Sequence, residues 1–316
     1  MLKVAIAGCG LITSKKHIPA FLKLKDKVEV AAICDLNADT AKKVADRFGI
    51  KKTYIDFADM LLKEKPYIVD ICTPPQTHAK LTIQAVESGA HVFIEKPMAL
   101  NTSDCDKMIE AAAKYGKKIY VIHNQIFNPA FMQARKQFLK GEIGDFLGIN
   151  IILSTPAHYM TEKKGHWAHS LPGGVLGETG PHIAYLALTF LKNISTVDIR
   201  AKKLLPEYPW SRFEDFRITL MADNGMGSVT FNYASNQWLA TVDVLGSKGI
   251  LKIDLLSRSC IKYNRPKLDA ASVGLSTIAS ALQILTQLIS NIFGYILGIG
   301  SDAHHIAITE FVNSIL

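Results

Sequence analysis

The sequence predicts an α/β domain built on a parallel sheet, followed by an α+β domain built on an antiparallel sheet. In the first part of the chain, short apolar runs alternate with stretches of helical spacing, which is typical of βαβ units. After about residue 124, strand-like runs follow one another directly, as they do in antiparallel sheets. We therefore expect two domains, residues 1–123 and 124–316.

The first domain is expected to hold parallel strands joined by helices. Its buried strands are the apolar runs 4–7, 28–33, 68–72, 92–94 and 119–123. Its helices are the segments 14–24, 38–48, 79–88 and 103–115, where apolar residues recur at helical spacing. Ser103 is the expected N-cap of the last helix, and Gly116 stands just past its end.

The second domain is expected to be a sheet of consecutive strands. The runs that predict them are 146–154, 196–203, 216–222, 227–233, 241–245 and 249–254. Asp223-Asn224-Gly225 separates two of these runs and favours a hairpin, since asparagine and glycine tolerate the positive φ angles of tight turns. Tight turns between consecutive strands predict an antiparallel sheet.

One segment near the end of the chain holds no charged residue from Asp269 to Asp302. Its polar residues recur at helical spacing: Ser276, Ser280, Gln283, Gln287, Ser290 and Gly294. Its other side is apolar: Ile278, Leu282, Leu285, Leu288, Ile289, Ile292 and Ile296. This pattern predicts an amphipathic helix whose uncharged polar face suits partial burial against the protein body or a second subunit. A membrane-surface helix and a membrane span remain alternatives.

Composition excludes several classes of protein. Hydrophobic residues make up 48% of the chain and charged residues 20%, which is ordinary for a soluble globular protein. The five cysteines show no C-x-x-C spacing, so we expect free thiols in a reducing compartment and no metal site. No charged stretch followed by an apolar core opens the sequence, so we expect no secretory signal and a cytoplasmic location. The net charge of +8 is spread along the chain and forms no basic block, which argues against nucleic-acid binding.

A glycine loop, Gly8-Cys-Gly10-Leu-Ile-Thr13, follows the first strand and precedes a helix. Glycines there allow a tight turn and the close approach of a pyrophosphate, which the amino terminus of the helix would bind. Thr13 stands where the usual dinucleotide fingerprint has a third glycine. A purely structural turn is the alternative.

Asp35 ends the second strand, 25 residues beyond Gly10. A carboxylate at this position accepts hydrogen bonds from the ribose hydroxyls of the adenosine and repels a 2′-phosphate. No arginine stands beside it, because Leu36 and Asn37 follow. The pattern favours NAD over NADP, and a helix N-cap or turn aspartate is the alternative.

Two further strands end in polar loops on the expected cofactor edge of the sheet. Thr73-Pro74-Pro75 follows the third strand, with His78 three residues on, and a plain turn that caps the next helix is the alternative. Glu95-Lys96-Pro97 follows the fourth strand. A lysine there can bind a substrate hydroxyl and help move its proton, whereas in the alternative it is a surface lysine paired with Glu95.

Glu178 and His182 lie four residues apart, which places them on one face of a helix. Histidine has the right ordinary pKa to take a proton near neutrality, and a nearby carboxylate can orient it. Pro181 fits near the start of that helix. A capping glutamate and a packed histidine are the alternative.

Together these stretches resemble the Gfo/Idh/MocA family, the glucose–fructose oxidoreductase and inositol dehydrogenase group. The matching stretches run in order over about 250 residues: 5–12, 33–37, 70–78, 95–97, 124, 127–129, 173–182 and 246–251. The resemblance implies an amino-terminal Rossmann domain and a second domain with a large, predominantly antiparallel sheet. It also implies hydride transfer between NAD and a hydroxyl carbon of a sugar, polyol or nucleotide sugar.

The resemblance also implies roles for individual residues. It assigns Lys96, His182 and Glu178 to catalysis. The cofactor contacts are expected from Gly8, Gly10, Leu11, Ile12, Asp35, Leu36, Thr73, Pro74, His78, Glu95, Lys96 and Asn124. The substrate contacts are expected from Lys96, Trp167, Glu178, His182 and Tyr185.

The sequence departs from the family pattern at positions that bear on the substrate. Glu178 and Tyr185 stand where aspartate is common, and Ile126 where arginine is common. The resemblance also leaves two alternative functions open: a sugar-modifying enzyme that holds NAD tightly, and a non-catalytic NAD sensor. We expect a homodimer or homotetramer with no membrane partner.

Overall fold

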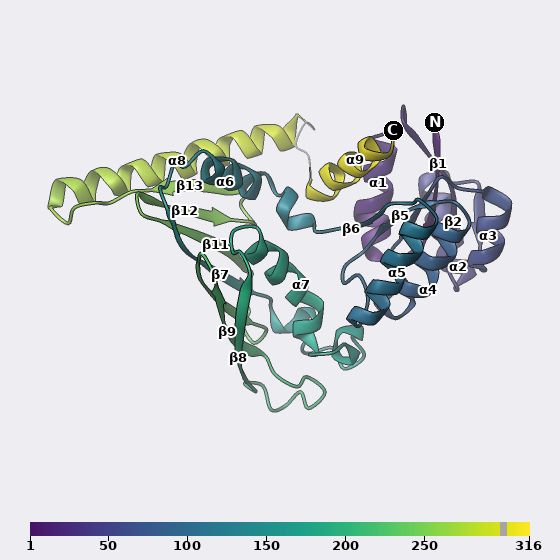
Figure 1. Ribbon diagram of the computed structural model, residues 1–316, viewed down its shortest axis with the longest axis horizontal. Coiled ribbons are helices and arrows are strands. Elements are labelled where there is room, and N and C mark those ends of the chain that lie inside the picture. The colour runs from purple at the N-terminus through teal and green to yellow at the C-terminus, as the bar shows by residue number, and fades with distance from the viewer. Residues whose placement is uncertain (298–301) are drawn as a thin grey trace. The chain divides into compact units, whose positions relative to one another are not determined.

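The computed structural model describes residues 1–297 and 302–316 and divides them into two compact units (Figure 1). The first unit holds residues 1–124 together with the carboxyl-terminal helix, and the described part of the second unit is residues 125–297. Each unit is built around one sheet. This confirms the predicted fold class of an α/β domain plus an α+β domain.

The sheet of the first unit has six strands, all parallel, in the order β3-β2-β1-β4-β5-β6. The strands are β1 (Leu2–Ala7), β2 (Val28–Cys34), β3 (Lys52–Tyr54), β4 (Ile68–Ile71), β5 (His91–Ile94) and β6 (Ile119–Val121). Five of them confirm predicted runs. The sequence analysis missed β3 because this short edge strand, Lys-Thr-Tyr, lacks an apolar alternation.

Helices connect these strands. They are η1 (Thr13–His17), α1 (Ile18–Leu22), α2 (Ala38–Phe48), α3 (Phe57–Glu64), η2 (Pro75–Thr77), α4 (His78–Glu87) and α5 (Thr102–Lys114). The N-cap of α5 is Asn101, whose side chain accepts a hydrogen bond from the Asp104 amide at 2.9 Å. The prediction of Ser103 as the cap was therefore wrong by two residues, since Asn101 caps the helix earlier.

The carboxyl-terminal helix α9 (Ala303–Ile315) belongs to the first unit, although we expected residues 124–316 to form one domain. Its Phe311 ring lies 5.4 Å from the Phe93 ring and 5.7 Å from the Tyr120 ring, centroid to centroid. Asp302, which caps α9, forms an ion pair with Lys16 at 2.6 Å. The apolar face of α9 thus completes a core that the amino-terminal strands begin.

The second unit is built on a seven-stranded sheet in the order β13-β12-β11-β7-β10-β9-β8. The strands are β7 (Phe146–Ser154), β8 (Ile194–Lys202), β9 (Asp215–Ala222), β10 (Gly225–Asn232), β11 (Leu239–Gly246), β12 (Gly249–Asp254) and β13 (Ser259–Tyr263). Every pairing is antiparallel except that of β7 with β10. The predicted hairpin joins β9 to β10 through Asp223 and Asn224, because Ala222 pairs with Gly225.

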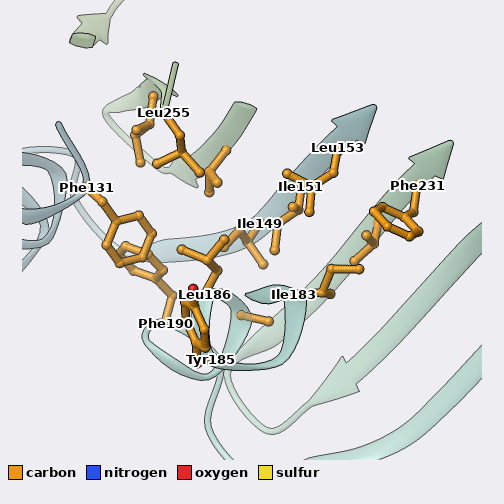
Figure 2. Close-up of a cluster of buried hydrophobic side chains, with 14 of the residues drawn as sticks. Phe131, Ile149, Ile151, Leu153, Ile183, Tyr185, Leu186, Phe190, Phe231 and Leu255 are labelled. Carbon is orange, nitrogen blue, oxygen red and sulfur yellow. The ribbon is translucent and has the colours of Figure 1, made fainter. Parts of the chain in front are cut away.

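One face of this sheet carries the core of the second unit (Figure 2). Ile149, Ile151 and Leu153 of β7 point to it at every second position and are almost fully buried. The helices of this unit are α6 (Pro129–Leu139), η4 (Ala157–Tyr159), η5 (Trp167–Ser170), α7 (Val175–Leu188) and α8 (Ala270–Ile296). The short helix η3 (Asn124–Phe127) begins at the last residue of the first unit and continues into the second. Phe131 of α6 packs edge-on against Phe190, 5.6 Å away, just beyond the end of α7.

The predicted amphipathic helix is α8, and it lies along the edge strand β13 (Figure 1). Its polar residues face the strand: Gln287 exchanges hydrogen bonds of 2.7 Å with both backbone groups of Cys260. The prediction that the polar face packs on the protein body is therefore confirmed. By length and composition alone, α8 is also long and apolar enough to cross a membrane.

Candidate active site

The glycine loop after β1 has the shape that a dinucleotide requires. Gly8 has a φ of +92°, and a Cβ there would lie 2.6 Å from the carbonyl oxygen of Cys72, so only glycine fits. At Gly10 a Cβ would meet no described atom within 4 Å, which leaves room for a ligand against the backbone. Thr13, the departure from the fingerprint, is buried and donates a 2.7 Å hydrogen bond to the Gly8 carbonyl. Its hydroxyl therefore closes the turn.

Asp35 is held beside this loop by two backbone amides. Its Oδ2 accepts from the Cys9 amide at 2.8 Å and its Oδ1 from the Asn37 amide at 2.9 Å. A carboxylate has about four lone-pair positions, so both oxygens can still accept from ribose hydroxyls. The loop and Asp35 thus fit the adenosine and pyrophosphate of NAD, while Leu11 and Leu36 beside them are 66% and 92% exposed.

His78 ties two of the predicted cofactor loops together. Its ring is buried, with Nδ1 2.9 Å from the Pro97 carbonyl oxygen and Nε2 2.8 Å from the Thr73 carbonyl oxygen. Burial lowers its pKa, so the neutral ring donates to one of these two oxygens. The His78 side chain is therefore placed to support these two loops. Direct contacts of His78 and of the exposed Pro74 with a cofactor stay predictions.

Glu95 begins the loop after β5 and is buried next to a histidine that sequence reasoning missed. Its Oε1 lies 3.0 Å from Nε2 of His17, and its Oε2 accepts from the Lys96 amide at 3.1 Å. The other ring nitrogen of His17, Nδ1, lies 3.0 and 3.1 Å from the two oxygens of Asp70. His17 therefore bridges two carboxylates and, through Glu95, holds the backbone at Lys96.

This network is charged. Burial lowers the pKa of His17, but the charge and hydrogen bond of Asp70 outweigh it and raise the pKa well above its ordinary value. Burial also raises the pKa of Glu95, but the hydrogen bond and charge of His17 outweigh it and bring the pKa down to about 2. At neutral pH the network is an imidazolium beside an ionised Glu95.

The same side chains form two groups close enough to be considered as metal ligands: His17, Asp70 and Cys72, and His17, Glu95 and His304. Direct hydrogen bonds join several of these groups, with His17 Nδ1 3.0 Å from Asp70 and His17 Nε2 3.0 Å from Glu95. Burial, with the charge of Asp70, raises the pKa of Cys72 to about 12. A metal at either group would have to displace the proton of the imidazolium.

In the second unit, helix α7 presents Glu178 and His182 on one half-buried face. Gly174, with a φ of +60°, turns the chain into the helix, and a Cβ on Gly177 would lie 2.3 Å from the Pro172 carbonyl oxygen. The helix begins at Val175, so Pro181 lies inside it and not near its start, contrary to the prediction.

Tyr185 is the partner of His182. Its ring lies in the core (Figure 2), and its hydroxyl hydrogen-bonds Nδ1 of His182 and accepts from the Gln125 amide at 3.2 Å. When Nδ1–H donates to the phenol oxygen, the ring lone pair is on Nε2, which is the atom that can take a proton. Tyr185 was expected to contact the substrate, but only 7% of it is exposed. Its hydroxyl is placed to orient His182.

Glu178 and Trp167 lie near the same helix start. Thr179 donates a 2.7 Å hydrogen bond to Oε2 of Glu178. Burial lowers the pKa of His166, and the nearby charge of Glu178 opposes this effect. Trp167, 39% exposed, stacks on His166 with a centroid distance of 5.8 Å. The ring of Trp167 therefore stays partly open to a ligand.

Comparison with known proteins gives the same picture. The family described as "Oxidoreductase family, NAD-binding Rossmann fold" matches residues 2–123, and the "GFO/IDH/MocA C-terminal domain" matches residues 131–252. D-glucoside 3-dehydrogenase of Escherichia coli K12 is 33% identical over 46% of this chain and 41% of its own. Inositol 2-dehydrogenase of Salmonella typhimurium LT2 is 32% identical over 51% of this chain and 49% of its own. The chain thus spans about half the length of these curated relatives.

Solved structures share the fold. Levoglucosan dehydrogenase in complex with NADH has a TM-score of 0.74 at 22% identity, covering 82% of this chain and 74% of its own. The WlbA dehydrogenase of Bordetella pertussis, in complex with NADH and UDP-GlcNAcA, has a TM-score of 0.73 at 19% identity, covering 91% and 93%. With the two family matches, which together cover more than half of the sequence, the chain belongs to the GFO/IDH/MocA family of NAD-binding oxidoreductases.

Proposed function

We propose that this protein is an NAD-dependent dehydrogenase that oxidises a hydroxyl-bearing carbon of a sugar, polyol or nucleotide sugar. The contact between His182 and Tyr185 carries the proposal, because it orients a histidine as a base in a chain that also has a dinucleotide loop. The named activities of the relatives, on glucosides and inositol, support the substrate class.

The proposed roles follow from the chemistry of each side chain. His182 takes the proton of the substrate hydroxyl at Nε2, while Tyr185 holds Nδ1. Lys96 binds the same oxygen and polarises it, and the His17–Glu95 network fixes the backbone that carries this lysine. Glu178 supports the base with negative charge. When bound, NAD supplies the acceptor for the hydride.

The test uses the purified full chain and measures NADH formation over a panel of sugars, polyols and nucleotide sugars. On the active substrate, Lys96→Ala and His182→Phe should each lower kcat by about 100-fold or more. Matched controls are Lys51→Ala and His158→Phe, which change exposed residues of the same types. Full turnover in Lys96→Ala and His182→Phe would overturn the mechanism, and no turnover of any substrate by the wild type would overturn the function.

We propose further that the protein works in the cytoplasm and self-associates. Cys9, Cys34, Cys72 and Cys260 are buried free thiols, as is common in a reducing compartment. The second sheet supports self-association, since Met221 and Met226, which pair on neighbouring strands, are 40% and 51% exposed. Light scattering should give twice or four times the chain mass of 34.8 kDa, and a monomer at all concentrations would contradict the proposal.

A further inference from the structure

Helix α8 packs on the protein through its polar face, whereas an ordinary surface helix packs through its apolar face. Its polar face points to the protein: Gln283 accepts from the Lys262 amide at 2.9 Å, and Asn291 donates to the Ser257 carbonyl at 2.9 Å. Gln283 and Gln287 bond to backbone groups of the edge strand β13, and Asn291 bonds to carbonyls of the turn that precedes it. None of the 27 residues of α8 is buried.

The opposite face of α8 is apolar and exposed. Eight of its large side chains are between 44% and 59% exposed: Ile278, Leu282, Ile284, Leu285, Leu288, Ile289, Ile292 and Phe293. From Ile284 on one flank to Phe293 on the other, at about 100° per residue, apolar positions span about half of the helix circumference. An uncovered apolar surface of this kind marks a site of interaction with a protein or a membrane.

The hydrogen bonds to β13 exclude a membrane span for α8. Residues of the helix from Gln283 to Asn291 are bonded to residues 257–262 of the sheet edge. A spanning helix would have to carry that polar strand into hydrocarbon or break these bonds. Helix α8 therefore lies along the surface of whatever covers it.

The width and charge of the face distinguish a bilayer from a second copy of the helix. A pair of helices buries a narrow seam flanked by charged residues that set partner and register. The apolar face of α8 is much wider, and no charged residue occurs between Asp269 and Asp302 to flank it. A flat bilayer surface, in contrast, covers half of a helix lying on it.

The charges that surround α8 complement an anionic surface. Between residues 255 and 301 there are four basic residues, Arg258, Lys262, Arg265 and Lys267, and one acidic residue, Asp269. Arg265 is held on the flank of α8 by a 2.8 Å hydrogen bond from its Nε to Ser276 and one of 2.9 Å to Thr277. Basic residues beside an apolar helix attract anionic headgroups.

We propose that α8 binds the surface of an anionic bilayer, with its outer face in the boundary between headgroups and acyl chains. The bonds to β13 keep the helix parallel to the membrane, and the basic residues around it contact the headgroups. This inference replaces the expectation of no membrane partner, which was made before the exposure of the apolar face was known. It is independent of the reaction proposed above.

Vesicle flotation of the purified full chain tests the proposal. Wild-type protein should float with vesicles of phosphatidylcholine mixed with phosphatidylglycerol, and less with phosphatidylcholine alone or in high salt. The double variant Leu282→Asp/Leu285→Asp should lower the bound fraction by about tenfold or more. Ser290→Asp is the matched control, because it adds a charge to an exposed position on the polar side and should float like the wild type.

Circular dichroism checks that each variant is folded. Light scattering without vesicles measures the mass of each variant. Wild-type protein that stays unbound with anionic vesicles overturns the proposal. So does a dimer that dissociates in Leu282→Asp/Leu285→Asp while vesicle binding is absent, which assigns the face to a second copy. Equal flotation of the wild type and the double variant also overturns it.

Discussion

Two histidines of this protein, His17 and His182, have opposite surroundings. His17 lies fully buried between the carboxylates of Asp70 and Glu95, which keep it protonated. His182 is half-buried on α7, and its Nδ1 is bonded to the neutral phenol of Tyr185. The partners differ in charge: two carboxylates stabilise the protonated form of His17, whereas the hydroxyl of Tyr185 orients His182 for the proton transfer that we propose.

The largest effect on turnover is expected from His182→Phe. Removal of the proposed base should lower kcat by about 100- to 10,000-fold, while the dissociation constant of NAD stays within about threefold. Steady-state kinetics and NAD titration by calorimetry measure the two quantities. Loss of NAD binding together with turnover would show that His182 supports the fold and would remove the contrast with His17.

Acid should destabilise the protein through Glu95. Its pKa is about 2 in the folded protein against 4.5 in an unfolded chain, so the unfolded state binds more protons and stability falls as pH falls between these values. The difference amounts to about 3 kcal/mol. The free energy of unfolding by urea, determined at a series of pH values from 6 to about 2, measures this loss of stability. The variant Glu95→Gln should lack this pH dependence. An unchanged slope in that variant would mean that other carboxylates are responsible.

A smaller effect is expected from Tyr185→Phe. Loss of the hydroxyl removes one hydrogen bond that orients the His182 ring, and kcat should fall by about tenfold while KM for substrate and the affinity for NAD are unchanged. Tyr159→Phe, at an exposed tyrosine, is the matched control. A rise in KM with unchanged kcat would instead support the sequence-based expectation that Tyr185 contacts the substrate.

The cofactor half of the site could be predicted because its signals are local. Gly8 must be glycine for the turn, and Asp35 ends the next strand, so position along the chain gives position in the parallel sheet. His17 could not be predicted in this way. Its partners are 53 and 78 residues away, and a buried ion network has no sequence periodicity.

Long-range packing also explains the other differences. Helix α9 joins the first unit because Phe311 completes an aromatic group with Phe93 and Tyr120, which spacing cannot indicate. For α8 the sequence predicted the two faces correctly, because helical periodicity is local. The strand that the polar face packs on, β13, was not predicted, because its hydrogen bonds with α8 join residues that are far apart in the sequence.

The contrast between the two histidines is tested most directly by measuring unfolding free energy and turnover together in His17→Gln and His182→Gln. His17→Gln should lose about 3–5 kcal/mol of stability, because two buried carboxylates lose their cation. His182→Gln should lose turnover and keep its stability within about 1 kcal/mol. A His17→Gln variant as stable as the wild type would contradict a stabilising charge on His17. Full turnover in His182→Gln would contradict the role of His182 as the base.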